Sequence, residues 1–253
     1  EVTVDFRLLR ADDPILQQVV DTATDEARMT QRAWLIARQT EGEDCGLSLL
    51  YENGDLIGST EAYGDAWKEK LRASITERYQ TLTIDESRLY IEEIQSGSRV
   101  LVFGGGHVAQ ALVPILVSVG FHALVFEDRE EFASKDLFPD ALAVKRVDFK
   151  KIDEAVTVQP GDYVCVMTRG HASDEIIQDQ VLHTEAKYIG VIGSKNKKAA
   201  VDANLHKRGH SWENIARIVS PIGLDLGGRT PEEIAISITA ELISVRAGRK
   251  IVK

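Results

Sequence analysis

The chain has 253 residues, of which 43% are hydrophobic and 28% are charged, as in a globular protein of one large or two modest domains. Its formal net charge of −10 argues against a nucleic-acid partner, because phosphate backbones are usually bound by basic faces. The longest apolar region, residues 111–126, is interrupted by Pro114 and Gly120 and is too short to span a bilayer. We therefore expect neither a nucleic acid nor a membrane as partner.

The two cysteines, Cys45 and Cys165, form no C-x-x-C pair, which argues against a disulfide framework or a structural zinc site. A reducing, cytoplasmic location is the expectation that follows. Cys165 lies within an apolar run and is expected to be a buried packing thiol. Cys45 lies in a polar stretch, and the sequence therefore allows it to be a reactive thiol.

The first part of the chain mixes helical and antiparallel strand patterns, which predicts a smaller α+β domain over residues 1–96. Asp13-Pro14 is typical of a helix start, and Asn53-Gly54 predicts a type I′ turn. Gln95-Ser-Gly-Ser98 is the expected boundary. The predicted elements are a strand at 2–7, a helix from Pro14, a helix at 31–38, a hairpin at 47–58, a helix at 65–79 and a strand at 88–94.

From Arg99 the pattern changes to alternating strands and helices, which predicts a Rossmann-like α/β domain over residues 97–253 with a parallel sheet covered on both faces. Thr230-Pro-Glu-Glu233 predicts a capping box that opens the last helix. Pro114 inside the first helix should kink it or cost roughly 3 kcal/mol. The predicted strands are 99–103, 122–127, 143–147, 163–168 and 188–192, and the predicted helices are 107–119, 150–156, 173–184, 195–208 and 230–247.

A glycine-rich turn joins the first strand and helix of this second part. Gly104, Gly106 and Ala109 fit the G-x-G-x-x-G/A spacing of dinucleotide-binding turns. The helix that follows presents unpaired N–H groups and a partial positive charge, which favour an anion. The candidate cofactor-binding residues of this turn are therefore Gly104, Gly105, Gly106 and His107. A tight turn that binds no ligand would have the same sequence pattern.

Three further strand ends are polar, and in a doubly wound sheet they would face one crevice. Asp128, which lies 24 residues after Gly104, is the candidate for a ribose-binding acid, with Glu127 as its competitor and Arg129 as a partner for phosphate or carboxylate. The other candidates are Thr168, Arg169, His171, Asp174, Gly193, Ser194, Lys195 and Lys197.

These candidates have alternative interpretations. Cations in a first helical turn oppose the helix dipole unless an anion is bound there, but long lysine side chains also reach freely into water. His107 and His171 suit an oxyanion contact or proton transfer, but each could simply bond to the backbone. Asp174 suits a helix cap equally well. We expect no metal ligands and no catalytic residues among them.

Five segments of the sequence together resemble the xanthine dehydrogenase accessory protein (XdhC/CoxI) family. The resemblance covers about residues 98–248. The Pro-Ile-Gly-Leu-Asp and Thr-Pro-Glu-Glu-Ile-Ala stretches are its most specific elements. In the first part, no cysteine matches the Gly-Gly-Cys-x-Glu stretch that members of the family usually carry. The matching segments are Gly104–Ala109, Glu127–Arg129, Met167–Asp174, Tyr188–Ser194 and Ser220–Ala235.

The resemblance implies a molybdenum cofactor chaperone, an accessory protein rather than an enzyme of hydride transfer. Members of the family bind the cofactor (molybdopterin with its metal), support its sulfuration by a cysteine desulfurase, and help to insert it into the apoenzyme of a molybdenum hydroxylase. The cofactor is anionic, which suits a glycine turn flanked by Arg129 and lysines. A homodimer is expected by analogy. An NAD(P)-dependent oxidoreductase is the alternative, and a nucleotide-sensing module is a third possibility.

Overall fold

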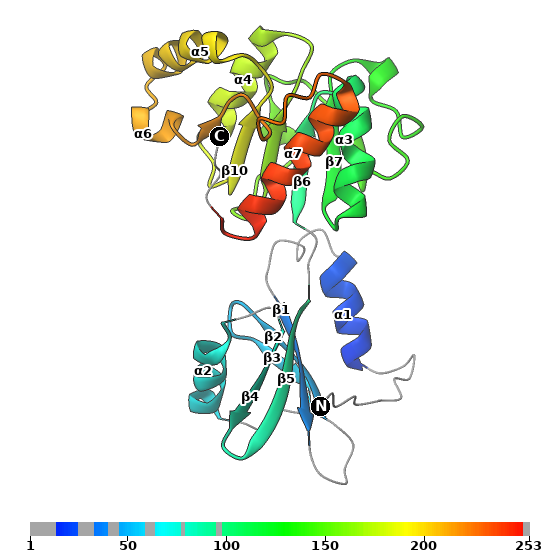
Figure 1. Cartoon of the computed structure of the whole chain (residues 1–253), viewed down its shortest axis with the longest axis vertical. Helices are drawn as coiled ribbons and strands as arrows, with labels where there is room; N and C mark the ends of the chain where they lie inside the picture. The colour runs from blue at the N-terminus through cyan, green and yellow to red at the C-terminus, as the bar shows by residue number, and fades with distance from the viewer. Residues whose placement is uncertain are drawn as a thin grey trace. The chain divides into compact units, whose positions relative to one another are not determined.

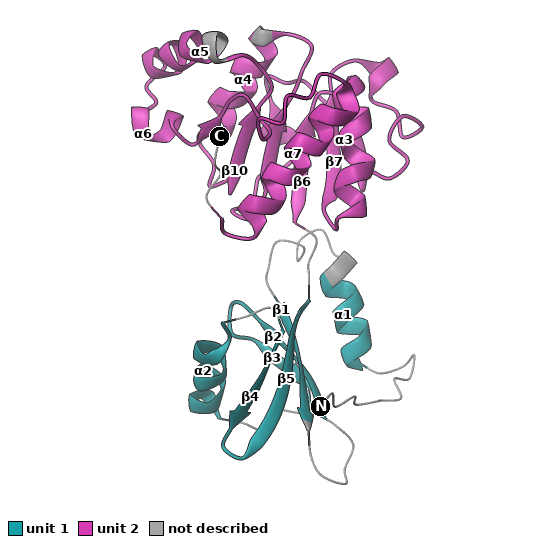
Figure 2. Ribbon diagram, in the orientation of Figure 1, with its two compact units in different colours: residues 1–97 teal, residues 98–253 magenta. Residues whose placement is uncertain are grey.

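The computed structural model describes residues 14–24, 33–39, 46–58, 64–76, 79–94 and 98–249. The chain forms two compact units, residues 1–97 and 98–253 (Figure 2). Each unit has its own hydrophobic core and is described by itself. No helix among these residues is long and apolar enough to cross a membrane.

The first unit is a five-stranded antiparallel sheet in the order β3-β2-β1-β5-β4. Helix α2 (Asp65–Ser74) packs Trp67 and Leu71 onto one face, while α1 (Pro14–Thr24) brings Val19 to the other (Figure 1). The strands are β1 (Ala33–Gln39), β2 (Gly46–Tyr51), β3 (Leu56–Gly58), β4 (Tyr79–Ile84) and β5 (Ser87–Ile94).

The helix predicted at 31–38 is wrong, because residues 33–39 form the central strand of this sheet. Both faces of β1 are covered, so its sequence does not alternate between apolar and polar residues. The helix predicted at 65–79 ends at Ser74, since Tyr79 already begins a strand that the sequence did not predict. The strand predicted at 2–7 and the residue Cys45 lie outside the described residues.

The hairpin of β2 and β3 is confirmed, but its turn is not type I′. Gly54 has a φ of +98°, and Asn53 is not among the described residues with positive φ. The Gly54 N–H donates to the Tyr51 carbonyl at 2.9 Å, and the Tyr51 N–H donates to the Asp55 carbonyl at 2.8 Å. This is a three-residue loop with a glycine bulge, and the Asn53 side chain instead accepts a hydrogen bond from the Asp55 N–H.

The second unit confirms the predicted Rossmann-like architecture. Six parallel strands lie in the order β11-β10-β9-β6-β7-β8, which is the order of dinucleotide-binding folds, and the connections reverse direction between β6 and β9. The strands are β6 (Arg99–Phe103), β7 (His122–Glu127), β8 (Ala143–Arg146), β9 (Tyr163–Val166), β10 (Tyr188–Val191) and β11 (Ile218–Val219).

Helices cover both faces of this sheet, as Figure 1 shows. Val100 and Val102 of β6 face α3 (His107–Ser118) and α7 (Pro231–Arg246), which lie side by side. Leu101 and Phe103 point the other way, toward α4 (His171–Val181), α5 (Lys195–Lys207) and α6 (Trp212–Ile215). Cys165 is buried in the first of these cores, as predicted, and burial raises the pKa of its thiol.

Two local features differ from expectation. The helix predicted at 150–156 is only a 3-10 turn (Ile152–Glu154). The Gln180 side chain bonds the backbone at its start, accepting from the Ile152 N–H at 3.0 Å and donating to the Phe149 carbonyl at 2.7 Å. Helix α3 continues through Pro114, whose ring lies on the exposed side. The capping box at Thr230 is confirmed.

A buried ion pair joins the amino-terminal ends of the two central strands. Arg99 Nε and Nη2 donate to the two carboxylate oxygens of Asp162 at 2.8 and 2.6 Å, and Asp162 is fully buried. Asp162 also accepts the Gln159 N–H at 2.7 Å, while Arg99 reaches the Thr157 carbonyl at 3.0 Å. The pair therefore fixes the approach of β9 to β6.

Replacing Asp162 with Ala should lower the free energy of unfolding by about 3–5 kcal/mol, because Arg99 would remain buried without its partner. Urea unfolding followed by circular dichroism measures the change. Glu154→Ala is the matched control, since it removes an exposed ion pair with Lys151 and should cost less than about 1 kcal/mol. Equal effects of the two variants would contradict this role of the ion pair.

Candidate functional site

The glycine turn after β6 lies at the point where the strand order reverses. Gly104 has a φ of +112°, and a Cβ on it would lie 2.4 Å from the Met167 carbonyl oxygen. The Gly104 N–H donates to the Phe126 carbonyl at 2.8 Å, and the Met167 N–H donates to the Phe103 carbonyl at the same distance. The turn therefore contacts the last residues of β7 and the segment that follows β9, and only glycine fits at its first position.

The next two glycines have different surroundings. A Cβ on Gly105 would lie 2.8 Å from the Phe132 carbonyl oxygen, and the Gly105 N–H donates to Glu127 Oε2 at 2.6 Å. A Cβ on Gly106 would meet nothing within 4 Å. Within the part of the chain that the structure describes, the N–H groups of Gly106 and His107 have no acceptor. Gly106 is thus the position at which an anion can approach the turn.

Glu127, at the end of β7, is only 1% exposed and accepts five hydrogen bonds. One comes from Gly105, and the Asp128 N–H and Arg129 N–H donate to Oε1 at 3.1 Å each. The Arg129 side chain adds two more, at 2.9 and 3.0 Å, and lies 3.9 Å above the Phe132 ring. Glu127 therefore joins the glycine turn to the end of the next strand.

Burial would raise the pKa of Glu127, but the hydrogen bonds from Arg129, Asp128 and Gly105 outweigh it and lower the pKa to about 2. Hydrogen bonding to Glu127 and partial burial raise the pKa of Asp128. Asp128 has an exposed side chain, so the two adjacent acids occupy different environments. A carboxylate with about four acceptor sites is saturated by five donors, which leaves Glu127 no capacity for a ligand hydroxyl.

Three helices begin at this edge of the sheet without a side-chain cap. The N-cap residues of α3, α4 and α5 are Gly106, Gly170 and Ser194, and none provides a capping hydrogen bond. In contrast, α6 and α7 are capped by Ser211 and Thr230. The uncapped helices follow β6, β9 and β10, so their positive ends face the edge where ligands of this fold bind.

Thr168 and Asp174 bond to each other. Asp174 is 4% exposed and accepts the Thr168 N–H at 3.0 Å and its hydroxyl at 2.6 Å. The pair shapes the loop between β9 and α4, where Arg169 is exposed. His107 is exposed at the start of α3, whereas the side chain of His171 lies outside the described residues.

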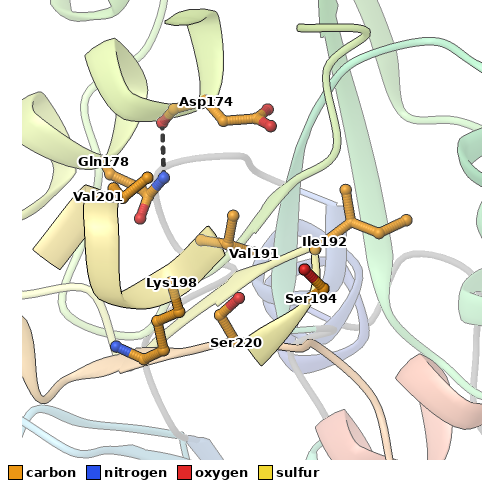
Figure 3. A pocket seen from close by; sticks show the side chains of 9 residues that line it. Asp174, Gln178, Val191, Ile192, Ser194, Lys198, Val201 and Ser220 are labelled. Atoms are coloured by element: carbon orange, nitrogen blue, oxygen red, sulfur yellow. Dashed lines mark hydrogen bonds between the residues drawn. The ribbon is translucent and has the colours of Figure 1, made fainter. Parts of the chain in front are cut away.

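A small pocket of about 30 Å³ lies between α4, α5 and the end of β10 (Figure 3). Ser194 and Gly193 line it, as the sequence suggested, together with Lys198, which is paired with Asp202 at 2.7 Å. The side chains of Lys195 and Lys197 lie outside the described residues. Gln178 is a lining residue that the sequence did not indicate, whereas Lys198 belongs to the lysine run and Ser220 opens the segment of family resemblance.

A larger pocket of about 350 Å³ adjoins it, since Ile192 and Gly193 line both. The loop from Pro221 to Gly228 forms most of its wall. Ser237 of α7 holds this loop by donating to the Leu224 carbonyl at 2.6 Å. The segment that carries most of the family resemblance therefore borders the same edge of the sheet.

Comparison with known proteins agrees with the family resemblance of the sequence. Residues 100–242 match the XdhC Rossmann domain. Curated relatives include the uncharacterized protein YqeB of Escherichia coli, a protein of Bacillus subtilis named as a probable subunit of xanthine dehydrogenase, and the molybdenum cofactor insertion chaperone PaoD of E. coli, each 28% identical. The alignments cover 58%, 63% and 58% of this chain and 27%, 46% and 40% of these relatives, so the chain spans less than half of each.

A crystal structure of a xanthine dehydrogenase from Bacillus halodurans has the same fold, with a TM-score of 0.73 at 24% identity. The match covers 93% of this chain and 68% of that one. The family match spans more than half of the chain and coincides with the parallel sheet and its glycine turn. The chain therefore belongs to the family of proteins that carry the XdhC Rossmann domain.

Proposed function

We propose that this chain binds a molybdenum cofactor at the glycine turn and delivers it to a molybdenum hydroxylase of the xanthine dehydrogenase type. The family and the relative named as a molybdenum cofactor insertion chaperone support this role. The cofactor would be cargo and not a resident catalytic group. A carrier must release its cargo, so moderate affinity and rapid dissociation suit the role better than tight retention.

The observation that carries the proposal is the set of three uncapped helix starts at one edge of the sheet. The cofactor has a phosphate at one end and an anionic metal-dithiolene at the other. The N–H groups of Gly106 and His107 suit the phosphate, because they are open and lie at the positive end of α3. Helices α4 and α5 offer two further positive ends for the rest of the molecule.

The same turn would also suit NAD(P), but Glu127 weighs against it. In dinucleotide folds an acid at the end of the second strand bonds the ribose hydroxyls. Here Glu127 occupies that strand end and is saturated by Gly105, Asp128 and Arg129. Only Asp128, whose side chain is exposed, remains for a bond to the ribose. The oxidoreductase alternative therefore depends on Asp128 alone for its ribose contact.

The proposal includes two protein partners and an assembly state. An apoenzyme would receive the cofactor, and a cysteine desulfurase would supply its terminal sulfur while the cofactor is held. Each transfer requires the metal end to stay accessible, which fits a site that binds the phosphate end through backbone N–H groups. A homodimer is part of the proposal by analogy with the family.

The full chain should retain molybdenum and pterin in about equal amounts after incubation with isolated cofactor and gel filtration. Elemental analysis measures the metal, and fluorescence of the oxidised pterin measures the organic part. A parallel incubation with NADH and NADPH should give no retained nicotinamide. Retention of a nicotinamide with hydride transfer, and of no molybdenum, would overturn the proposal.

Gly106→Asp tests the anion site directly. The new carboxylate can cap α3, so the melting temperature should stay the same or rise, while its negative charge should weaken cofactor binding at least tenfold. Gly64→Asp is the matched control, because Gly64 is also an uncapped N-cap with open space around it, but in the first unit. Cofactor affinity that is equal in both variants would contradict a site at Gly106.

Glu127→Gln should lower the free energy of unfolding by about 3 kcal/mol at pH 7, because the native pKa of Glu127 is lowered from 4.5 to about 2. The contribution of a carboxylate with a lowered pKa is present above its unfolded pKa and is lost as the pH falls toward 2. The difference between the two proteins should therefore shrink between pH 5 and pH 3 in urea unfolding. Glu131→Gln, an exposed change in the same segment, should show no such trend.

A further inference from the structure

A second cluster of polar side chains lies at the far ends of the helices that begin at the candidate site. Asp179 is near the end of α4, His183 follows that helix, and His210 follows α5. One possible ligand atom from each of these residues lies within 4.8 Å of the others. We call Asp179, His183 and His210 the Asp179 cluster. Its members were not predicted from the sequence, because only the fold brings His210 to the other two.

The donor set of the Asp179 cluster is two imidazoles and one carboxylate. This set suits a divalent transition metal such as Zn²⁺, with water completing the coordination. Asp179 lies in the last turn of α4, and His183 follows four residues later, just beyond the end of the helix. The His183 and His210 rings lie 4.7 Å apart between their centroids. His183 is exposed, so an ion can reach the cluster from solvent.

Neighbouring groups orient the ligands of the cluster. Arg208 donates to Asp179 Oδ2 at 3.0 Å and to Glu175 at 2.7 Å, so the other oxygen, Oδ1, faces His210 Nε2 at 2.7 Å. His206 Nδ1 lies 2.9 Å from the His210 carbonyl and holds the backbone of that loop. Metal-binding carboxylates and histidines are usually held by such outer contacts.

The charges around the cluster also favour a cation. Asp179 and Glu175 carry two negative charges against the one positive charge of Arg208. The Asp179 carboxylate is half-buried beside these charges. The carboxyl-terminal ends of α4 and α5, with their partial negative charges, both lie beside it.

We propose that Asp179, His183 and His210 form a binding site for one divalent transition-metal ion of the Zn²⁺ class. The ion replaces the direct hydrogen bond between Asp179 and His210 and recruits His183 as third ligand. It joins the end of α4 to the loop after α5. These are the two helices whose uncapped starts face the candidate cofactor site, so the metal would fix their spacing from the opposite end.

Metal titration of the full chain, without a histidine tag and stripped with a chelator, tests the site. Calorimetry with Zn²⁺ should show one ion per chain with micromolar or tighter affinity. Co²⁺ should give visible absorption bands of a site with nitrogen and oxygen ligands. Zn²⁺ should also raise the melting temperature, because a ligand that binds only the native state stabilises it.

His183→Ala should lower the affinity at least tenfold and abolish the Co²⁺ bands, with little effect on the fold because the side chain is exposed. Asp179→Asn should weaken binding as well, and loss of the carboxylate makes it the more severe change for the fold. His122→Gln is the control, since it removes a histidine outside the cluster and should leave Zn²⁺ affinity unchanged. Absence of one-to-one binding, or equal affinity in His183→Ala and the native chain, would overturn the proposal.

Discussion

The candidate site of the second unit depends on one buried carboxylate, Glu127, at the end of β7. Glu127 accepts the N–H of Gly105 and both N–H and guanidinium donors of Arg129, and so connects the end of β7 to the turn after β6. This contact occupies the N–H of Gly105 and the carboxylate of Glu127, and it leaves Asp128 as the exposed acid at this strand end. The open amides then lie one residue further on, at Gly106 and His107. The contact thereby sets which backbone N–H groups of the turn remain open to a ligand.

Much of the second unit could be predicted from the sequence. The parallel strands are short apolar runs that end in glycine or polar residues, and the helices between them begin at recognisable positions. Thr230 and Glu233 form the expected capping box, and Cys165 is buried as its neighbours suggested. The five strands with predicted ranges all form, with ends that differ by at most two residues. Such patterns are local in the sequence. The predicted elements form because each local preference agrees with the packing around it.

Other features depend on contacts between distant residues and left no local pattern. Residues 33–39 lack alternation because both faces of β1 are covered, so their pattern resembles that of a helix. In the segment expected to be a helix at 150–156, the Ile152 N–H donates to the side chain of Gln180, which lies 28 residues away. The choice between Glu127 and Asp128 rests on the end of one strand, which a sequence cannot locate to a single residue. The Asp179 cluster requires two separate helices to end at the same place.

The position of Pro114 has a mechanical consequence. Proline has no N–H, so the Gln110 carbonyl one turn earlier receives no hydrogen bond from it. The Gln110 side chain, meanwhile, donates to the Gly105 carbonyl at 3.0 Å. The first turn of α3 is therefore attached more firmly to the glycine turn than a regular helix would be, and less firmly to the rest of its own helix. The anion-accepting end of α3 is therefore tied back to the glycine turn by a side chain, at the place where the proline takes one backbone hydrogen bond from the helix.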